Sequence, residues 1–478
     1  MGLQKIKTDN NLLCRPLPLL LGVLRKLQDN LDSFPGTPEV EPAGLDHQED
    51  VLSMLGHFWH LIKAADTSIR YTDQEDQEQE QEEEQEEGQR EGLGAIRRRY
   101  ASMLGIPEEQ VVWIWSSRIE KKSRLSDYVP EHLITIDHRH RSLILTILGT
   151  KVFPFPQPLD IMMDLLGTGQ TFLDGVAHGG MSIGTRNLVE TAVPVLRREL
   201  LVHPSYTLLV LGYSLGAGLA QLLSLDCSQG PCSHSLPHNT NIRTVAFGSP
   251  PVFSRQGGED PPALENVFIV QNGRDGIGGA SLANIYDLLN RACLLHNMNI
   301  KRRTLLRLLF SDVDIEEDRD LIDFEDDEDD SEKIEHDRSE DEENSFITDT
   351  WRKIKESFDN YSSQVDEPKL HHLGGTFLVL TKTDDNTIEA QNYQGFEGTE
   401  KFSRELTLQP SMISDHMPNA YDSLFEDYQD FNKTNKILNY QLLDNLVPRK
   451  REGFRDKLKK KFKKIKSKVL GLFKGIGK

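Results

Sequence analysis

The segment TLLVLGYSLGAGLAQLLSL, residues 207–225, constrains the fold more than any other part of the 478-residue chain. An apolar run rich in Leu and Val precedes a Gly-Tyr-Ser-Leu-Gly turn, and a second apolar run rich in Ala and Leu follows it. The first run is typical of a buried strand and the second of a buried helix. A strand that enters a helix through such a turn is a building unit of sheets covered by helices.

Further apolar runs predict that this unit belongs to a mainly parallel sheet. VVWIW begins at Val111, and the runs LITID and SLILTILGT flank HRHR as the two strands of a hairpin do. IRTVAFGSP and VFIVQNGRD are two more buried strands, and HHLGGTFLVLTK, 371–382, is a strand after a glycine turn. Helical stretches alternate with the strands, so we expect an α/β protein whose sheet is flanked by helices.

Composition divides the chain into a core and segments of different character. Hydrophobic residues make up 37% of the chain, so part of its length is expected to be disordered. The acidic runs 73–92 and 312–344 carry like charges that repel one another and cannot be buried. The helical stretch 281–310 fits either a lid or a helix packed on the core. The predicted segments are an N-terminal helical region, 1–110; a first part of the core, 111–290; a helical and acidic disordered insertion, 291–366; a second part of the core, 367–448; and a basic tail, 449–478.

The basic tail predicts contact with an anionic membrane surface. It holds 14 Lys and Arg against two acidic residues, a net charge of +12, whereas the whole chain carries −21. Its apolar residues recur every three or four positions and would form one face of a helix, which favours a membrane interface. A disordered tail that binds the chain's own acidic runs is the alternative, and nucleic acid is not expected because it has no use for the apolar face. The apolar residues are Phe454, Leu458, Phe462, Ile465, Val469, Leu472 and Ile476.

Cysteines and apolar run lengths bear on the compartment. The four cysteines, at 14, 227, 232 and 293, lack the spacing of a CxxC pair, so we expect thiols in a reducing compartment. Residues 1–27 lack a secretory layout, and no run approaches the ~20 apolar residues of a membrane span. The sequence therefore predicts a cytoplasmic protein that binds membranes peripherally.

The Gly-Tyr-Ser-Leu-Gly turn predicts a nucleophilic serine. Ser214 lies between a strand and a helix, where strained backbone angles lift its hydroxyl clear of the sheet. Gly212 and Gly216 avoid clashes at this turn, and the helix N-terminus directs N–H groups toward developing negative charge. The alternative is a glycine-rich turn without chemistry. The flanking strand and helix favour the nucleophile.

A serine nucleophile needs a histidine base and an acid that orients it. In α/β-hydrolases the acid and the base follow the serine in that order along the chain. Asp275 follows a buried strand and is our candidate acid; its alternative is a turn-forming aspartate. His416 lies in a polar turn before a helix-like stretch and is the candidate base, with a capping or surface histidine as its alternative. The other downstream histidines are His296 in a basic helix, His336 in the acidic run, and His371 and His372 before a strand.

Several segments together resemble the class 3 (fungal-type) lipases. They are LVLGYSLGAGLAQLLSL, VAFGSPPV, VFIVQNGRD and SDHMPNAY, preceded by LITIDHRHRSLILTILGT, DIMMDLLG and VAHGGM. The Gly-Ala-Gly after the serine resembles the intracellular diacylglycerol lipase branch. The resemblance covers about 111–290 and 367–425 and implies an α/β-hydrolase fold.

The resemblance also assigns site residues. Ser214 matches the nucleophile, Asp275 the acid and His416 the base. Thr150 matches the oxyanion-loop residue, and the backbone N–H of Leu215 is the other expected oxyanion donor. The chain departs from the family in three places. Leu148 replaces the arginine of the oxyanion loop, Gly276 follows the acid in place of an apolar run, and Tyr213 replaces a histidine at a flank expected to have no chemical role.

These patterns predict a serine ester hydrolase that cleaves fatty-acyl esters of di- or triacylglycerol at a membrane surface. This chemistry requires no metal or organic cofactor. Phospholipase A1 activity and acyl transfer would use the same three side chains and stay open as alternatives. An inactive scaffold that binds lipid is the alternative from a different class.

Overall fold

The computed structural model describes most of the chain between Leu17 and Leu446. The described residues are 17–31, 42–70, 85–117, 125–151, 164, 167–255, 262–298, 300–310, 340–359, 361, 365–383, 385–406, 408–428, 438, 440 and 442–446. The whole basic tail, most of the acidic run 312–344 and residues 73–84 of the other acidic run lie outside these ranges. The predictions for those segments are therefore not addressed by the structure.

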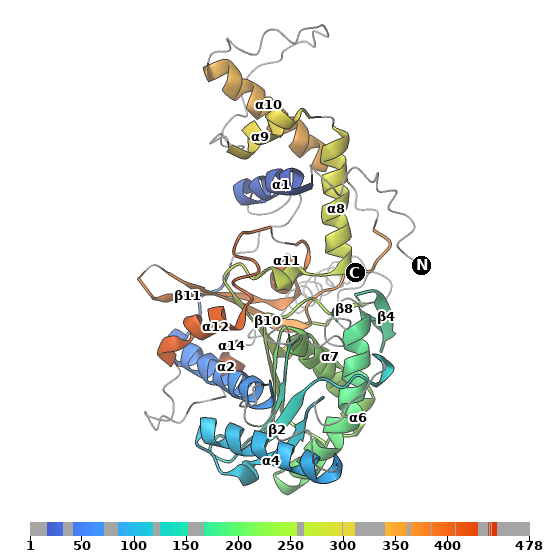
Figure 1. Ribbon diagram of the computed structural model, residues 1–478, viewed down its shortest axis with the longest axis vertical. Helices are drawn as coiled ribbons and strands as arrows, with labels where there is room; N and C mark the ends of the chain where they lie inside the picture. The colour runs from blue at the N-terminus through green and yellow to red at the C-terminus, as the bar shows by residue number, and fades with distance from the viewer. Residues whose placement is uncertain are drawn as a thin grey trace, which may run out of the picture.

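An eight-stranded sheet forms the centre of the structure (Figure 1). Its strand order is β1-β2-β3-β6-β7-β9-β10-β11. Strands β3, β6, β7, β9 and β10 run parallel, while β1, β2 and β11 pair antiparallel with their neighbours. The strands are β1 Val111–Trp115, β2 His132–Asp137, β3 Ser142–Ile147, β6 Thr207–Tyr213, β7 Ile242–Phe247, β9 Leu264–Asn272, β10 Gly374–Lys382 and β11 Ile388–Gln394. This mainly parallel sheet confirms the predicted α/β fold class.

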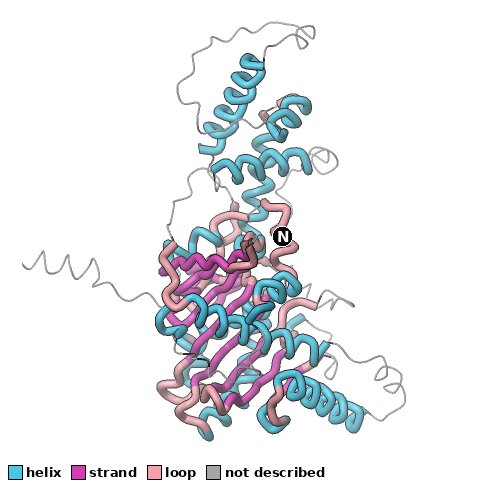
Figure 2. The backbone as a smooth tube through the Cα atoms, turned by 90° about the vertical axis from the view of Figure 1, so that its left-hand side faces the viewer, coloured by secondary structure: helices cyan, strands magenta, loops and turns pink. Residues whose placement is uncertain are grey.

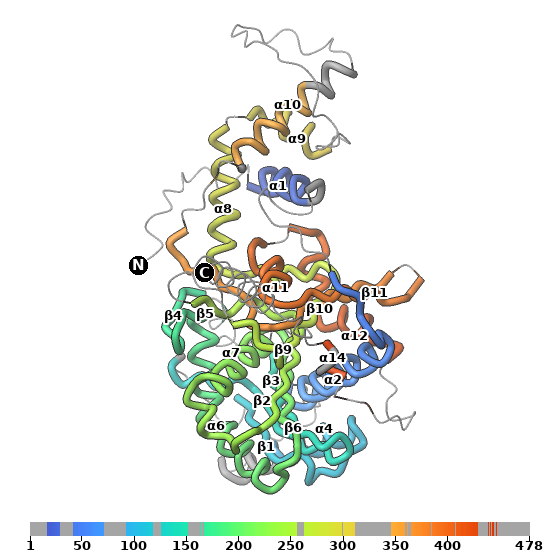
Figure 3. The backbone as a smooth tube through the Cα atoms, turned by 180° about the vertical axis from the view of Figure 1, so that it is seen from behind, coloured from blue at the N-terminus to red at the C-terminus, as the bar shows by residue number. Residues whose placement is uncertain are grey.

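Helices cover both faces of the sheet because its central strands are apolar on both sides. In β6, Leu208 and Val210 face one cluster of buried residues, whereas Leu209 and Leu211 face another. The first cluster includes α6, Gly179–Val202, and α7, Leu215–Gln229. The second includes α2, Gln48–Arg70, and α4, Gln85–Leu104. Figure 3 shows α6 and α7 on one side of the strands and α2 and α4 on the other.

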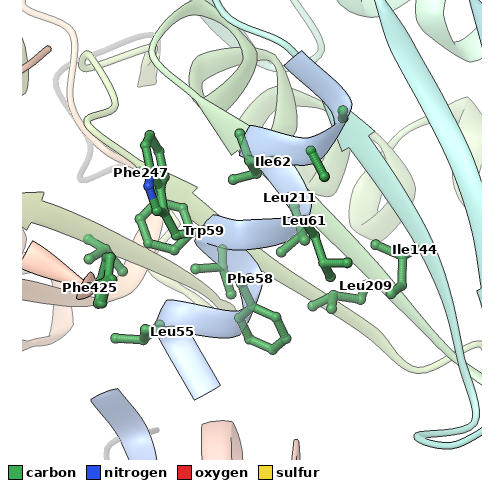
Figure 4. Packing of buried hydrophobic residues seen from close by; sticks show 14 of the residues in the cluster. Leu55, Phe58, Trp59, Leu61, Ile62, Ile144, Leu209, Leu211, Phe247 and Phe425 are labelled. Carbon is green, nitrogen blue, oxygen red and sulfur yellow. The ribbon is translucent and has the colours of Figure 1, made fainter. Parts of the chain in front are cut away.

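Helix α2 places large side chains directly on the sheet (Figure 4). Phe58 and Trp59 are at most 1% exposed. The Trp59 ring lies 5.7 Å from that of Phe247 on β7 and 5.2 Å from that of Tyr213 at the end of β6. The N-terminal helical region therefore contributes to the same hydrophobic core as the sheet.

Short elements complete the sheet domain. A second, three-stranded sheet has the order β4-β5-β8. Figure 2 shows the strands of the large sheet in magenta, with helices around them. The short strands are β4 Gly169–Phe172, β5 Gly175–His178 and β8 Phe253–Arg255; the short helices are η2 Glu108–Gln110, η3 Leu125–Asp127, η4 Pro231–His234, η6 Gly276–Gly279, α11 Gly395–Ser403, α12 Pro418–Leu424, η7 Glu426–Tyr428 and α14 Leu442–Leu446.

Four helices form a separate hydrophobic cluster beyond one end of the sheet (Figure 1). They are α1 Leu17–Leu31, α8 Leu282–Asn297, α9 Arg302–Phe310 and α10 Glu340–Asp359. Leu24 of α1, Ala292 of α8 and Trp351 of α10 are at most 1% exposed. Helix α8 therefore packs in a helical cluster separate from the core of the sheet, so neither interpretation of 281–310, a lid or a helix packed on the core, is confirmed.

The cysteine prediction is wrong for two residues. Cys227 at the end of α7 and Cys232 in η4 are joined by a disulfide, and their Cα atoms are 4.5 Å apart. The helix end and the short turn after it fold back on each other, which a spacing rule for CxxC pairs does not detect. Cys293 is a free thiol. Among the described helices, none combines the length and the apolar character needed to cross a bilayer.

Candidate active site

The turn after β6 has the geometry of a nucleophile elbow. Ser214 has φ 56° and ψ −122°, a left-handed conformation that a residue with a side chain rarely adopts. A Cβ at Gly212 would collide with the Gly216 carbonyl, and one at Gly216 with the Ile147 carbonyl. Both glycines are therefore needed for the close approach of β6, α7 and β3. This packing places the Ser214 side chain, which is half-buried, just beyond the carboxyl end of the strand.

Three candidate side chains form one chain of hydrogen bonds. The Ser214 Oγ lies 2.9 Å from His416 Nε2, and His416 Nδ1 lies 2.9 Å from Asp275 Oδ2. Asp275 follows β9 and is 2% exposed, whereas His416 lies in the turn before α12 with 15% of its side chain exposed. The structure thus brings together residues 61 and 202 positions from Ser214 along the chain, in the order hydroxyl, imidazole, carboxylate.

Two tyrosines support the imidazole and the carboxylate. The Tyr421 hydroxyl donates to Asp275 Oδ2 at 3.1 Å, and the Tyr213 hydroxyl donates to the His416 carbonyl. The Tyr213 ring also stacks on the His416 ring at 5.3 Å between centroids. Burial raises the pKa of both tyrosines well above 10, so their hydroxyls stay protonated and act as donors. Tyr213, expected to have no chemical role, therefore contacts the candidate base.

The loop that carries His416 is held against the loop that carries Asp275. Asn272 Nδ2 donates to the Asp415 carbonyl at 3.0 Å, and the Arg274 N–H donates to Asp415 Oδ2 at 3.0 Å. The Gly276 N–H donates to the Met412 carbonyl at 3.0 Å, and a Cβ at Gly276 would lie 3.0 Å from the Met412 Cβ. The departure at Gly276 therefore gives room for the loop that carries the histidine.

The predicted oxyanion residues lie at the start of α7 and after β3. Leu215 is the first residue of α7, where backbone N–H groups lack partners within the helix. Gly149 lies directly against the elbow, since a Cβ there would be 3.1 Å from the Ser214 Cβ. The Thr150 hydroxyl donates to Asp164 Oδ2 at 2.6 Å. The Thr150 side chain is thus engaged with Asp164, and the oxyanion role of Thr150 stays a prediction.

Contacts across the chain reveal residues that sequence reasoning missed. Arg70 at the end of α2 donates through Nη2 to the Gly149 carbonyl. Its Nε lies 3.2 Å from Glu131 Oε2. Tyr421 was likewise outside the predicted set, although it lies five residues after the predicted His416. The short distance in sequence between this tyrosine and the candidate base was the one available signal for Tyr421. No local sequence pattern marks Arg70.

Among the remaining histidine candidates, those that the structure describes make no hydrogen bond to Ser214. His296 lies on α8 in the helical cluster, and His336 lies outside the described residues. The His372 Nε2 lies 2.8 Å from the Gly278 carbonyl, and burial lowers the His372 pKa to about 3. The His371 Nδ1 lies 3.5 Å from the Ser403 hydroxyl. Both are therefore structural residues of the β10 side of the sheet.

Residues 147–282 match the family model of the class 3 lipases. This segment contains the elbow, the oxyanion loop and the candidate acid in the geometry given above. By this match, residues 147–282 are similar to a class 3 lipase domain. His416 and Arg70 lie outside the matched segment, so their places at the site come from the folded chain itself.

Individual relatives show where the lipase domain is similar to known proteins. Diacylglycerol lipase-beta of Mus musculus is 31% identical over 101 residues, which cover 20% of this chain and 14% of that protein. The lipase from Rhizopus microsporus var. chinensis is 16% identical, with a TM-score of 0.32 over 51% of this chain and 72% of that one. The Rhizomucor miehei lipase propeptide complex is 16% identical, with a TM-score of 0.31 over 51% and 66%.

One group of side chains among the residues that the structure describes has the composition of a metal site. Ligand atoms of His57, Asp137 and His140 lie within 4.8 Å of one another. His140 Nδ1 already lies 2.6 Å from Asp137 Oδ2, and its Nε2 accepts the Leu438 N–H at 3.3 Å. The β2–β3 turn lies beside the start of β6, whereas Ser214 follows the end of that strand. The group is therefore remote from the candidate active site.

Proposed function

We propose that this chain is a serine hydrolase that cleaves fatty-acyl esters of acylglycerols. The hydrogen-bonded series Ser214, His416 and Asp275 carries the proposal. In this mechanism the Ser214 hydroxyl attacks the ester carbonyl while His416 accepts its proton. Asp275 orients the imidazole and stabilises its positive charge, and the Tyr421 hydroxyl holds the carboxylate in place.

The attack creates a negative oxygen that the backbone N–H groups of Thr150 and Leu215 would stabilise. His416 then passes the proton to the leaving alcohol, and an acyl group remains on Ser214. Water, deprotonated by His416, releases the fatty acid and restores the serine. The match to a protein called diacylglycerol lipase-beta favours diacylglycerol over triacylglycerol as the substrate.

An assay of fatty-acid release tests the activity and the substrate class together. Full-length protein is offered vesicles that contain diacylglycerol, triacylglycerol or phospholipid, and released fatty acid is measured with and without an acceptor alcohol. Ser214→Ala should reduce release by at least about 10⁴-fold. Ser228→Ala, an exposed serine on the same helix α7, is the matched control and should retain activity. Equal release by wild type and Ser214→Ala would contradict the proposal.

We also propose that the protein acts at the cytoplasmic face of a membrane and that residues 449–478 bind it. The alternation of lysines with a regular apolar face supports this, because both features suit an anionic interface. Deletion of the tail should weaken binding to vesicles with anionic lipid and leave binding to neutral vesicles nearly unchanged. Binding that is unaffected by the deletion would refute the role of the tail.

A further inference from the structure

A buried arginine contacts the loop that lies against Ser214. Arg70 is 8% exposed, and its guanidinium spans three acceptors. Nη2 donates to the Gly149 carbonyl, Nε lies 3.2 Å from Glu131 Oε2, and Nη1 lies 2.8 Å from Asp66 Oδ1. A planar guanidinium with all three contacts has one orientation only. The Gly149 carbonyl is therefore held in a defined direction.

This direction determines where the next N–H points. The Gly149 carbonyl and the Thr150 N–H belong to one planar trans peptide, so they point in opposite directions. Holding the carbonyl toward Arg70 directs the Thr150 N–H away from Arg70. Because the carbonyl accepts a hydrogen bond from a cation, the peptide is polarised and its N–H becomes a stronger donor. The Thr150 N–H is one of the two donors in the proposed mechanism.

Neighbouring contacts hold the whole loop in register with the elbow. The Leu148 N–H donates to the Glu131 carbonyl at 2.9 Å, so Glu131 contacts the loop through its backbone and Arg70 through its carboxylate. A Cβ at Gly149 would lie 2.7 Å from the Tyr213 carbonyl. A small shift of the loop would therefore change the distance between the oxyanion donor and the carbon that Ser214 attacks.

Burying the charged groups of this network costs free energy, so we expect the network to have a role besides packing. Glu131 is 4% exposed, and its other carboxylate oxygen accepts the Ser117 hydroxyl at 2.9 Å. Burial raises the pKa of Asp66, an effect that Arg70 opposes. A buried ion pair is a weak source of stability compared with apolar side chains of the same volume. Orientation of a loop, by contrast, requires the directed donors that a guanidinium supplies.

We propose that Arg70 is a positioning residue that orients and polarises the Thr150 N–H for the oxyanion. The proposal rests on the proposed function of Ser214. Leu148 replaces the arginine that the resemblance led us to expect in this loop. Arg70 of α2 supplies a cation to the same loop. In this role Arg70 acts through the Gly149–Thr150 peptide.

Two substitutions in the full-length protein test this role. Arg70→Lys keeps the buried positive charge but has no fork to reach all three acceptors, and Arg70→Met removes the charge. We expect kcat on a soluble short-chain ester to fall about 10-fold in Arg70→Lys and about 100-fold in Arg70→Met, with KM changed less than about twofold. Arg291→Lys and Arg291→Met are the controls, because Arg291 pairs with Asp287 at 2.8 Å within α8 of the helical cluster.

The outcomes separate this inference from the proposed function. An Arg70→Lys protein with the wild-type melting temperature and wild-type kcat would overturn the positioning role, since charge alone would then suffice. A loss that appears in KM and melting temperature but not in kcat would also overturn it. Should Arg70→Met fail to fold, Arg70→Lys alone decides. Wild-type protein that hydrolyses no ester would instead refute the proposed function of Ser214.

Discussion

At the scale of single residues, the site depends on hydrogen bonds to groups that do not react. The Asp275 carboxylate is buried, so each hydrogen bond that it accepts helps to hold it in position. The Ile277 N–H donates to Asp275 Oδ1 at 2.9 Å, and the Tyr421 hydroxyl donates to Oδ2. Oδ2 thus accepts both from Tyr421 and from the His416 imidazole. The tyrosine therefore affects where the carboxylate holds the base.

Tyr421→Phe removes one of these donors without removing the ring. We expect kcat to fall about fivefold, the effect of one hydrogen bond, with little change in KM. Steady-state kinetics on a soluble ester measure both. Tyr428→Phe is the control, because the Tyr428 hydroxyl donates to Glu49 at 3.1 Å on the exposed side of α2. Equal kcat in wild type and Tyr421→Phe would show that the carboxylate is held without the tyrosine.

A buried neutral histidine should make stability depend on pH. Burial lowers the His372 pKa to about 3, whereas an unfolded histidine titrates near 6.5. Between pH 6.5 and 3, His372 therefore binds a proton in the unfolded chain but not in the folded chain. The free energy of unfolding consequently falls as the pH drops from 6.5 toward 3. His372→Gln, which can still donate to Gly278, should reduce this fall by up to about 1.4 kcal/mol per pH unit. Urea unfolding at several pH values measures it, and an unchanged slope would contradict the assignment.

At the scale of elements, the strand, elbow and helix were predictable from local sequence. The features are contiguous in the sequence: an apolar strand, glycines two positions to either side of Ser214, and an Ala/Leu helix. Contiguous features can be recognised without knowledge of the tertiary fold. The order serine, aspartate, histidine gave a further constraint and pointed to Asp275 and His416. The contact of Arg70 with Gly149 was not predictable, because the two residues are 79 positions apart in the sequence and their contact depends on the whole fold.

Gly216→Ala tests whether the elbow needs its glycines. The added Cβ would collide with the Ile147 carbonyl, a rigid backbone atom, so we expect a loss of about 1–3 kcal/mol of stability and of most activity. Gly94→Ala on α4 is the matched control, because its Cβ would meet only the end of the Arg98 side chain at 3.3 Å. It should be neutral or stabilising by about 0.4–1 kcal/mol. Thermal unfolding and ester hydrolysis of both variants decide, and a stable, active Gly216→Ala protein would contradict the steric argument.

At the scale of the whole molecule, distant parts of the chain pack into separate hydrophobic clusters. Helices α2 and α4 join the core of the sheet, while α1 joins α8, α9 and α10 in the separate cluster. The sequence predicted an N-terminal helical region, 1–110, but could not assign its helices to different partners. Such assignment depends on long-range packing, which a single sequence does not reveal. The proposed segment boundaries remain predictions.

Trp351→Ala should destabilise the helical cluster without destabilising the core of the sheet. Trp351 is 1% exposed within the helical cluster, and its truncation should cost that cluster about 3–5 kcal/mol. Amide hydrogen exchange is expected to accelerate in α1, α8, α9 and α10 and to stay unchanged in β6 and β7. Hydrolysis of a soluble ester should be retained. Faster exchange throughout the sheet would show instead that the chain unfolds as one cooperative unit.

Covalent labelling tests the central claim, the nucleophilic role of Ser214, most directly. Full-length wild type is treated with a fluorophosphonate, which reacts with activated serines, and the labelled peptide is identified by mass spectrometry. We predict one adduct on the peptide that contains Ser214, its loss in Ser214→Ala, and greatly slowed labelling in His416→Ala, because the base is required for attack. Folded wild type that stays unlabelled, or that is labelled at another serine, would contradict the account.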